Sequence, residues 1–368
     1  MKILAVIGTR PEAVKMLPLV KELKRYKEFE TLVCFSGQHE TLANNVFELF
    51  DVMPDYRLSN LSNGLSLNEM TSILLNYFDD LFKTISPDIL LVHGDTTTAF
   101  CASLAGFYQG IKIAHIEAGL RTFNNQSPFP EEFNRVAIDS LSSIHFAPTK
   151  IAAKNLKKEG IKSIFTTGNT GIDAVKYTLN ENYCSPILSE QKSKKIILIT
   201  THRRENLGDK MTSSLLGIKD ALENREDVFI IVPTHPNPLI KSKVESVFAN
   251  IKNFKICPPL PLYDFHNILA RSHLVISDSG GIQEEAAYLG IPLLLLRDTT
   301  ERVECINQNT KIIGTERNKI SAEITRLLDN EILINDMRKK SLSFGNGYAS
   351  KKIAKNLLSL LKKSDIIK

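Results

Sequence analysis

The strongest constraint on the fold is an alternation that runs along most of the chain, in which short apolar, β-branched segments take turns with longer amphipathic ones. In the first half, six segments have the composition of buried strands: Lys2–Ile7, Thr31–Ser36, Asp88–His93, Lys112–Ile116, Ile144–Ala147 and Ser163–Thr166. Helical patterns lie between them, at Glu12–Lys24, Leu67–Phe82, Thr96–Tyr108 and Glu131–Ser142. This alternation is typical of right-handed βαβ units, whose parallel sheet is covered by helices on both faces.

A polar stretch at Asn180–Lys194 interrupts the rhythm, contains Pro186 and has no clear hydrophobic period. The alternation then resumes with five further strand candidates: Lys195–Thr200, Val228–Val232, Phe254–Cys257, Leu274–Ser277 and Pro292–Leu296. With 368 residues, the chain exceeds the roughly 250 at which single cores stop growing. We therefore predict an α/β protein with two Rossmann-like, doubly wound domains. Their expected bounds are 1–179 and 195–350, with a linker at 180–194 and a terminal helix at 351–364 that joins the first domain.

Composition and charge exclude several classes of protein. The net charge of +5 is local, because Met337–Lys368 holds nine Lys or Arg against one Asp and the rest of the chain carries −3. Without interleaved aromatic residues, this basic end predicts a solvated helix rather than a nucleic-acid surface. Five widely spaced cysteines with no C-x-x-C pair argue against disulfides and zinc, and favour a reducing cytoplasm. The apolar runs are too short for membrane insertion, and the N-terminus does not resemble a signal peptide.

Candidate functional residues lie directly after the predicted strands, because doubly wound sheets bind ligands at the carboxyl ends of their strands. After the first strand, Thr9 and Glu12 fit a capping box, and Pro11 suits the start of a helix. Arg10 has no such structural explanation, since a cation is unfavourable at the positive end of a helix dipole. A bound phosphate would offset this cost, with Lys15 one turn further along as a weaker candidate.

Three carboxylates follow other strands of the first half. Asp95 stands before a predicted helix and could be only its cap, whereas Glu117 precedes Gly119 in what looks like a loop. Glu131 or Glu132 begins the next helix and could serve only its dipole. Three carboxylates are nevertheless more than capping requires. Crowded in one partly dry site, carboxylates raise each other's pKa and can act as general acids and bases.

The second half offers groups that bind phosphate. Ser279, Gly280 and Gly281 open a helix whose first N–H groups could bind a diphosphate, and Glu285 follows within reach of a ribose. Nucleotide and metal signatures such as G-x-G-x-x-G, G-x-x-x-x-G-K-[ST] and H-E-x-x-H are absent, and the histidines lack ligand spacing. We therefore predict no cofactor and no metal. The residues favour a nucleotide-sugar substrate, but leave glycosyl transfer and isomerisation both open.

The motifs of the chain also occur in the order found in a known family. They are GTRPEAVKMLPLV (8–20), SGQHE (36–40), HGDTTTAF (93–100), HIEAGLRT (115–122), PEEFNR (130–135), HRRENLG (202–208), SDSGGIQEEAAYLGIP (277–292) and RDTTERVE (297–304). Over essentially its whole length the chain resembles the non-hydrolysing UDP-N-acetylglucosamine 2-epimerases. The resemblance implies a GT-B type fold with the active site in the interdomain cleft, and a cytoplasmic homodimer. It also implies interconversion of UDP-N-acetylglucosamine and UDP-N-acetylmannosamine for cell-surface polysaccharide synthesis, without a nicotinamide cofactor.

The resemblance also assigns roles to residues. The family eliminates UDP to form 2-acetamidoglucal and then adds it back, and the residues matched to this acid–base chemistry are Asp95, Glu117 and Glu131. His202 is expected beside the diphosphate and the sugar. The residues expected to bind UDP are Arg10, Lys15, Phe265, Ser279, Gly280, Gly281, Glu285 and Arg302, with Glu285 on the ribose and Phe265 beside uracil. Which carboxylate is the base and which the acid stays open.

A second, allosteric substrate site of the family is only partly matched. Its matching positions are Gln38, His39, Glu131, Arg203 or Arg204, and His235. The chain departs from the pattern at Thr41, where many bacterial members have Gln, and near Gly64, where they have Arg. These departures argue against activation by UDP-N-acetylglucosamine at a second site, and they predict binding there that is weaker or differently made. The alternative functions are a UDP-N-acetylfucosamine-type 2-epimerase, a hydrolysing relative, a GT-B glycosyltransferase and a non-catalytic nucleotide-sugar sensor.

Overall fold

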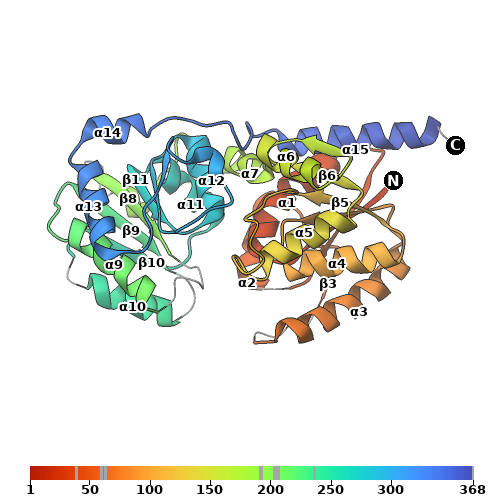
Figure 1. Ribbon diagram of the computed structural model, residues 1–368, viewed down its shortest axis with the longest axis horizontal. Coiled ribbons are helices and arrows are strands. Elements are labelled where there is room, and N and C mark those ends of the chain that lie inside the picture. The colour runs from red at the N-terminus through yellow and green to blue at the C-terminus, as the bar shows by residue number, and fades with distance from the viewer. Residues whose placement is uncertain are drawn as a thin grey trace. The chain divides into compact units, whose positions relative to one another are not determined.

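The computed structural model describes residues 1–37, 40–58, 61, 64–189, 194–201, 208–234, 238–249 and 251–366. The chain forms two compact units. Unit 1 comprises Met1–Lys176 and Phe344–Lys368, and unit 2 comprises Tyr177–Ser343. Each unit is a parallel sheet with helices packed around it (Figure 1).

The sheet of unit 1 has seven parallel strands in the order β3-β2-β1-β4-β5-β6-β7. Their bounds are β1 (Lys2–Ile7), β2 (Glu30–Phe35), β3 (Tyr56–Arg57), β4 (Ile89–His93), β5 (Lys112–Ile116), β6 (Ile144–Ala147) and β7 (Ile164–Thr166). The chain proceeds outward from β1 in one direction and then restarts at β4 in the other. The carboxyl ends of β1 and β4 therefore form a topological switch point, the place where such sheets bind ligands.

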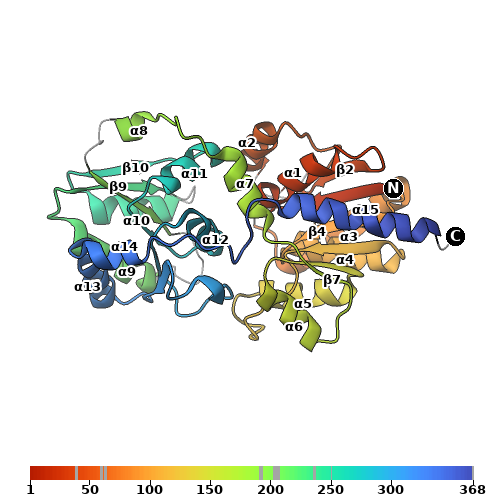
Figure 2. The ribbon, with the colours of Figure 1, turned by 90° about the horizontal axis from the view of Figure 1, so that it is seen from above.

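Helices of unit 1 pack in two groups. Helices α3 (Leu67–Ile85), α4 (Thr97–Tyr108) and α5 (Glu131–Leu141) lie side by side, whereas α1 (Arg10–Leu23) contacts α2 (Glu40–Phe50) and the terminal helix α15 (Ala349–Ile366) (Figure 2). The remaining helices are α6 (Lys150–Lys158) and α7 (Thr170–Thr178). The core strands are apolar at successive positions, as in β4, because helices cover both faces of the sheet.

The sheet of unit 2 has six parallel strands in the order β10-β9-β8-β11-β12-β13. Their bounds are β8 (Lys195–Thr200), β9 (Val228–Pro233), β10 (Phe254–Cys257), β11 (Leu274–Ser277), β12 (Leu293–Leu295) and β13 (Thr310–Ile312). Its helices are α8 (Pro186–Ser189), α9 (Asp209–Leu222), α10 (Pro238–Phe248), α11 (Leu262–Ala270), α12 (Gly280–Leu289), η2 (Val303–Cys305), α13 (Arg317–Leu328) and α14 (Glu331–Asp336). The switch point of this sheet lies between β8 and β11.

The predicted α/β fold with two doubly wound parallel sheets is confirmed. Each of the eleven predicted strands overlaps an observed strand, whereas the edge strands β3 and β13 were not predicted. Both edge strands are only two or three residues long and include Arg57 or Lys311, so they lack an apolar run. Among the described residues, no helix is long and apolar enough to cross a membrane.

Candidate active site

The turn between β1 and α1 is organised by Glu12. The Thr9 hydroxyl caps α1 by accepting from the Glu12 N–H, and the Glu12 carboxylate in turn accepts from the Gly8 N–H at 3.1 Å and the Thr9 hydroxyl at 2.8 Å. It also accepts from the Thr96 hydroxyl at 2.9 Å. Burial raises the pKa of Glu12 to about 7, although these hydrogen bonds favour its charged form. Arg10, the predicted phosphate ligand, is the first residue of α1.

Glu117 lies at the carboxyl end of β5 in a cluster of buried polar groups. Its Oε2 forms an ion pair with Lys15 from α1 and accepts from the Asn169 amide at 2.6 Å. A Cβ placed on Gly94 would lie 3.7 Å from Glu117 Oε1, so Glu117 lies against the residue that precedes Asp95. The structure thus brings Lys15 and Glu117 together with the turn that carries Asp95.

The backbone of Glu117 has φ +69°, in the left-handed region that residues with a Cβ seldom adopt. This conformation costs about 1–2 kcal/mol relative to the right-handed one. The Glu117 and Ala118 N–H groups both donate to the Phe146 carbonyl, at 3.1 and 3.2 Å, which helps to hold the turn. Strain of this kind concentrates at functional sites, where the surrounding structure stabilises it.

His93, the last residue of β4, faces the same carboxylate. Its Nε2 lies 3.8 Å from Glu117 Oε2 and has no hydrogen-bond partner among the described residues. Burial lowers the pKa of His93 to about 4, against the opposing effect of Glu117, so the ring is neutral near pH 7. A neutral imidazole beside a carboxylate leaves a buried polar atom available for a ligand.

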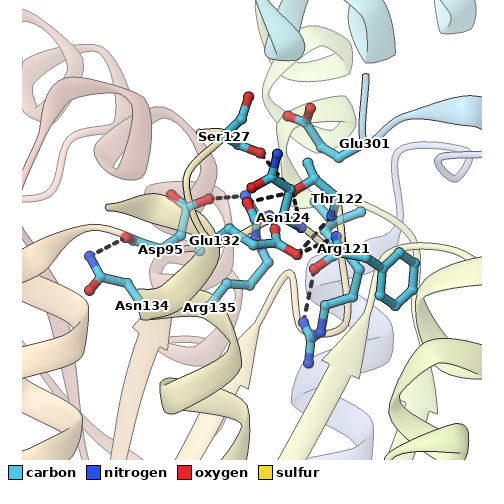
Figure 3. A network of polar contacts seen from close by, with 12 residues as sticks. Asp95, Arg121, Thr122, Asn124, Ser127, Glu132, Asn134, Arg135 and Glu301 are labelled. Atoms are coloured by element: carbon cyan, nitrogen blue, oxygen red, sulfur yellow. Dashed lines mark hydrogen bonds and ion pairs between the residues drawn. The ribbon is translucent and has the colours of Figure 1, made fainter. Parts of the chain in front are cut away.

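Asp95 belongs to a second network, drawn in Figure 3. Arg135 of α5 pairs with Asp95 through one guanidinium nitrogen and donates to Glu132 through another at 2.6 Å. Glu132 also accepts from the Thr122 N–H at 2.8 Å, and the Asn134 amide donates to the Asp95 carbonyl at 3.0 Å. The first turn of α5 therefore ties the loop at Thr122 to the turn at Asp95.

Glu131 and Glu132 take different places at the start of α5. Glu132 is buried and its carboxylate is engaged by Arg135 and the loop backbone, which makes it a structural residue. Glu131, the predicted acid–base residue, is the first residue of the helix and is half-buried. Its position at the positive end of the helix dipole favours a negative charge.

The predicted diphosphate site of unit 2 has the expected helix start. Ser279 is the N-cap of α12, and its hydroxyl makes no capping hydrogen bond. A Cβ on Gly280 would lie 2.6 Å from Arg302 Nη1, so a larger residue there would displace the Arg302 side chain. Arg302 is buried and pairs with Glu301 and, at 2.5 Å, with Glu284. The N–H groups of the first helical turn and this guanidinium thus lie together.

Glu285, one turn further along α12, faces His266 of α11 at 3.6 Å between Oε1 and Nε2. The other ring nitrogen of His266 lies 2.6 Å from the Thr178 hydroxyl. Among the described residues, Glu285 Oε2 is a buried oxygen without a hydrogen-bond partner. Phe265, the predicted uracil neighbour, lies half-buried beside His266 on α11, with ring centroids 6.1 Å apart.

Six predicted site residues lie outside the described residues: Gln38, His39, His202, Arg203, Arg204 and His235. The side chain of Thr41 also lies outside them. Gly64 is described and has φ +97°, a conformation that favours glycine.

Comparison with known proteins identifies the family of the chain. A sequence model of the UDP-N-acetylglucosamine 2-epimerase family matches residues 21–358. A UDP-N-acetylglucosamine 2-epimerase of Bacillus subtilis is 45% identical over 361 residues, which cover 97% of this chain and 95% of the relative. The chain belongs to the UDP-N-acetylglucosamine 2-epimerase family. The membership and enzyme class predicted from the sequence are thereby confirmed.

Two solved structures of the UDP-N-acetylglucosamine 2-epimerase family extend the comparison to the fold. The enzyme from Neisseria meningitidis, bound to UDP-GlcNAc, has a TM-score of 0.93 and 39% identity, covering 98% of this chain and 100% of that one. The enzyme from Methanocaldococcus jannaschii, in complex with UDP-GlcNAc and UDP, has a TM-score of 0.85 and 32% identity over the same coverage. The predicted GT-B type architecture is confirmed.

Several contacts of this UDP-N-acetylglucosamine 2-epimerase family member were not predicted from its sequence. Asn169, which donates to Glu117, lies 52 residues further along the chain. Arg135, which pairs with Asp95, lies 40 residues away, although it stands in the PEEFNR motif. The only sequence signal was that both residues stand near the carboxyl end of a strand or the start of a helix. Side-chain direction, which decides such contacts, has no short-range signature in the sequence.

Proposed function

We propose that the chain interconverts UDP-N-acetylglucosamine and UDP-N-acetylmannosamine by anti elimination of UDP and its re-addition. The observation that carries this proposal is the pair of carboxylates at the neighbouring ends of β4 and β5. Asp95 is held by Arg135, and Glu117 is held by Lys15 and Asn169, with Gly94 between them. Family membership supports the UDP-N-acetyl sugar as the substrate.

The reaction requires acid–base groups of this kind. In the forward direction a base takes the proton from C2, the C1–O bond breaks, and UDP leaves 2-acetamidoglucal with a C1=C2 double bond. UDP then adds back at C1 while an acid delivers a proton to the opposite face of C2. Asp95, Glu117 and Glu131 supply the proton-transfer groups, and Lys15 places a positive charge against the carboxylate of Glu117. Most of the rate enhancement comes from positioning and from stabilising the charge of departing UDP.

Unit 2 provides the groups for UDP. The Ser279 hydroxyl, the N–H groups of Gly280 and Gly281 and the Arg302 guanidinium bind the diphosphate, helped by Arg10 of unit 1 and by His202. Glu285 accepts hydrogen bonds from the ribose hydroxyls, a role supported by its buried, unpartnered Oε2 within the described structure. Phe265 lies beside the uracil ring.

The same proposal covers the compartment, the oligomeric state, the cofactor requirement and the metabolic role of the enzyme. The enzyme works in the cytoplasm as a homodimer, uses no cofactor or metal, and supplies a precursor of cell-surface polysaccharide. The residues that match a second substrate site are Gln38, His39, Glu131, Arg203 or Arg204, and His235. Because the chain departs from the family pattern at Thr41 and near Gly64, binding at this site is weaker or differently made, and activation through it is not expected.

Isotope exchange tests the proposal directly. In deuterated water, the protein should place deuterium at C2 of UDP-N-acetylglucosamine and convert part of it to the manno isomer. Asp95→Asn should abolish exchange while UDP still binds, which calorimetry measures. Absence of exchange in the wild-type protein, or release of free UDP in proportion to sugar consumed, would contradict the proposed reaction.

A further inference from the structure

A buried charged network lies behind the two turns that carry Asp95 and Glu117. Its centre is His115 of β5, which is fully buried. Nδ1 of His115 lies 2.6 Å from Asp139 Oδ1, and Nε2 lies 2.7 Å from the Gly94 carbonyl oxygen. Both ring nitrogens therefore face oxygen atoms at hydrogen-bond distance.

The partners of His115 decide its protonation state. A carbonyl oxygen can only accept, so Nε2 must carry a hydrogen. Asp139 Oδ2 accepts from the Gly119 N–H at 3.1 Å and lies 2.7 Å from the Arg121 guanidinium. Independently of His115, the Arg121 charge and the Gly119 N–H both favour the ionised form of this carboxyl. Because an ionised carboxylate cannot donate, Nδ1 must carry a hydrogen as well.

The charges of the network then balance. His115 and Arg121 are positive, Asp139 is negative, and Glu159 forms a second, two-pronged ion pair with Arg121 at 2.6 and 2.9 Å. The neighbouring ring of His145 donates to the Asp139 carbonyl at 2.8 Å, and burial lowers its pKa, which keeps it neutral. A buried imidazolium is tolerated when its charge is paired and both N–H groups are hydrogen-bonded.

Each half of the His115–Asp139 ion pair holds one of the two turns. His115 binds the carbonyl of Gly94, whose φ is +66° and which directly precedes Asp95. Asp139 binds the N–H of Gly119, two residues after Glu117. One ion pair thus connects the backbone positions of both proposed acid–base residues.

We propose that His115 is a positioning residue, an imidazolium that donates through both ring nitrogens and so sets the geometry of the Asp95 and Glu117 turns through the Gly94 carbonyl and Asp139. Its effect on catalysis rests on the proposed function, whereas its protonation state does not. His115 touches no reacting atom in this account, so it acts on turnover more than on substrate affinity.

The protonation state is tested by nitrogen NMR of the wild-type protein labelled at histidine. The His115 signals, assigned by their loss in His115→Asn, should show that both ring nitrogens carry a hydrogen in the folded protein at neutral pH. A ring with only one protonated nitrogen would overturn the proposal. This measurement needs neither substrate nor activity.

Two matched variants test the positioning role. The amide nitrogen of Gln reaches the place of Nε2 and can donate to Gly94, whereas that of Asn reaches the place of Nδ1 and can donate only to Asp139. Both variants remove the charge. We expect His115→Asn to lower kcat for C2 exchange by about 10- to 100-fold with KM nearly unchanged, and His115→Gln to recover part of that loss.

The outcomes separate this proposal from the proposed function. Equal kcat losses in folded Asn and Gln variants, or a change confined to KM, would overturn the positioning role. Circular dichroism confirms that each variant is folded. Wild-type protein that lacks C2 exchange would contradict the proposed function while leaving the NMR result intact. Exchange by a wild-type protein with a neutral His115 would overturn the inference alone.

Discussion

The clearest test of the electrostatics in unit 1 is Glu12→Gln, because Glu12 is buried and its pKa is raised to about 7 from 4.5. A carboxyl whose pKa is higher in the folded protein binds its proton more tightly there than in the unfolded chain. Stability is therefore lost as the pH rises from 4.5 towards 7, by about 3 kcal/mol once both states are ionised. Gln resembles the protonated carboxyl, since its oxygen can accept from Gly8 and its amide can donate to the Thr96 hydroxyl.

We compare the free energy of unfolding of Glu12→Gln with that of wild type. We expect the difference, variant minus wild type, to increase by about 2–3 kcal/mol between pH 5 and pH 8. Urea unfolding followed by circular dichroism at both pH values measures the difference, and the other titrating groups cancel between the two proteins. The matched control is Glu69→Gln. Hydrogen bonds from Ser66 lower the pKa of Glu69, so that group stays ionised and its variant should change stability by a nearly constant amount over this range. A Glu12→Gln difference that is constant or falls with pH would refute the reasoning.

Three further predictions concern single contacts. Asp139→Asn should destabilise the protein by about 3–5 kcal/mol in urea unfolding, because it leaves two buried cations without their shared carboxylate; a loss below about 1 kcal/mol would contradict the charge assignment. Gly280→Ala should cost about 1–3 kcal/mol, since the new Cβ would meet Arg302 at 2.6 Å, and a neutral effect would mean that Arg302 moves freely. Glu285→Gln should weaken UDP binding about tenfold by calorimetry, whereas unchanged affinity would remove Glu285 from the ribose site.

Much of the fold could be predicted because its signals are local. The apolar run of β4 is buried at every position and bounded by polar residues, so periodicity alone located it. The capping of α1 by Thr9 follows from residues within three positions of one another. Edge strand β3 could not be found in this way, because a two-residue strand is defined by its pairing with β2 rather than by its composition.

Only those site residues that directly follow a strand of the parallel sheet could be predicted from the sequence. The rule that ligands bind after parallel strands selected Asp95 and Glu117, and both stand in polar networks of unit 1. It could not select Asn169 or Asp139, whose importance depends on where their side chains point across 52 and 24 residues of chain. Such contacts need three-dimensional coordinates, because no spacing in the sequence distinguishes them from solvent-facing polar residues.

The structure gives Lys15 a partner that the sequence did not predict. One helical turn beyond Arg10, it looked like a second cation for phosphate, yet its ammonium group is paired with the buried Glu117 carboxylate. A buried carboxylate without a cation would gain a proton and lose its use as a base near neutral pH. In the proposed reaction, the pairing therefore serves the proton-transfer step. The cation and the carboxylate act as one unit, and the strained backbone of Glu117 is the local cost of bringing them together.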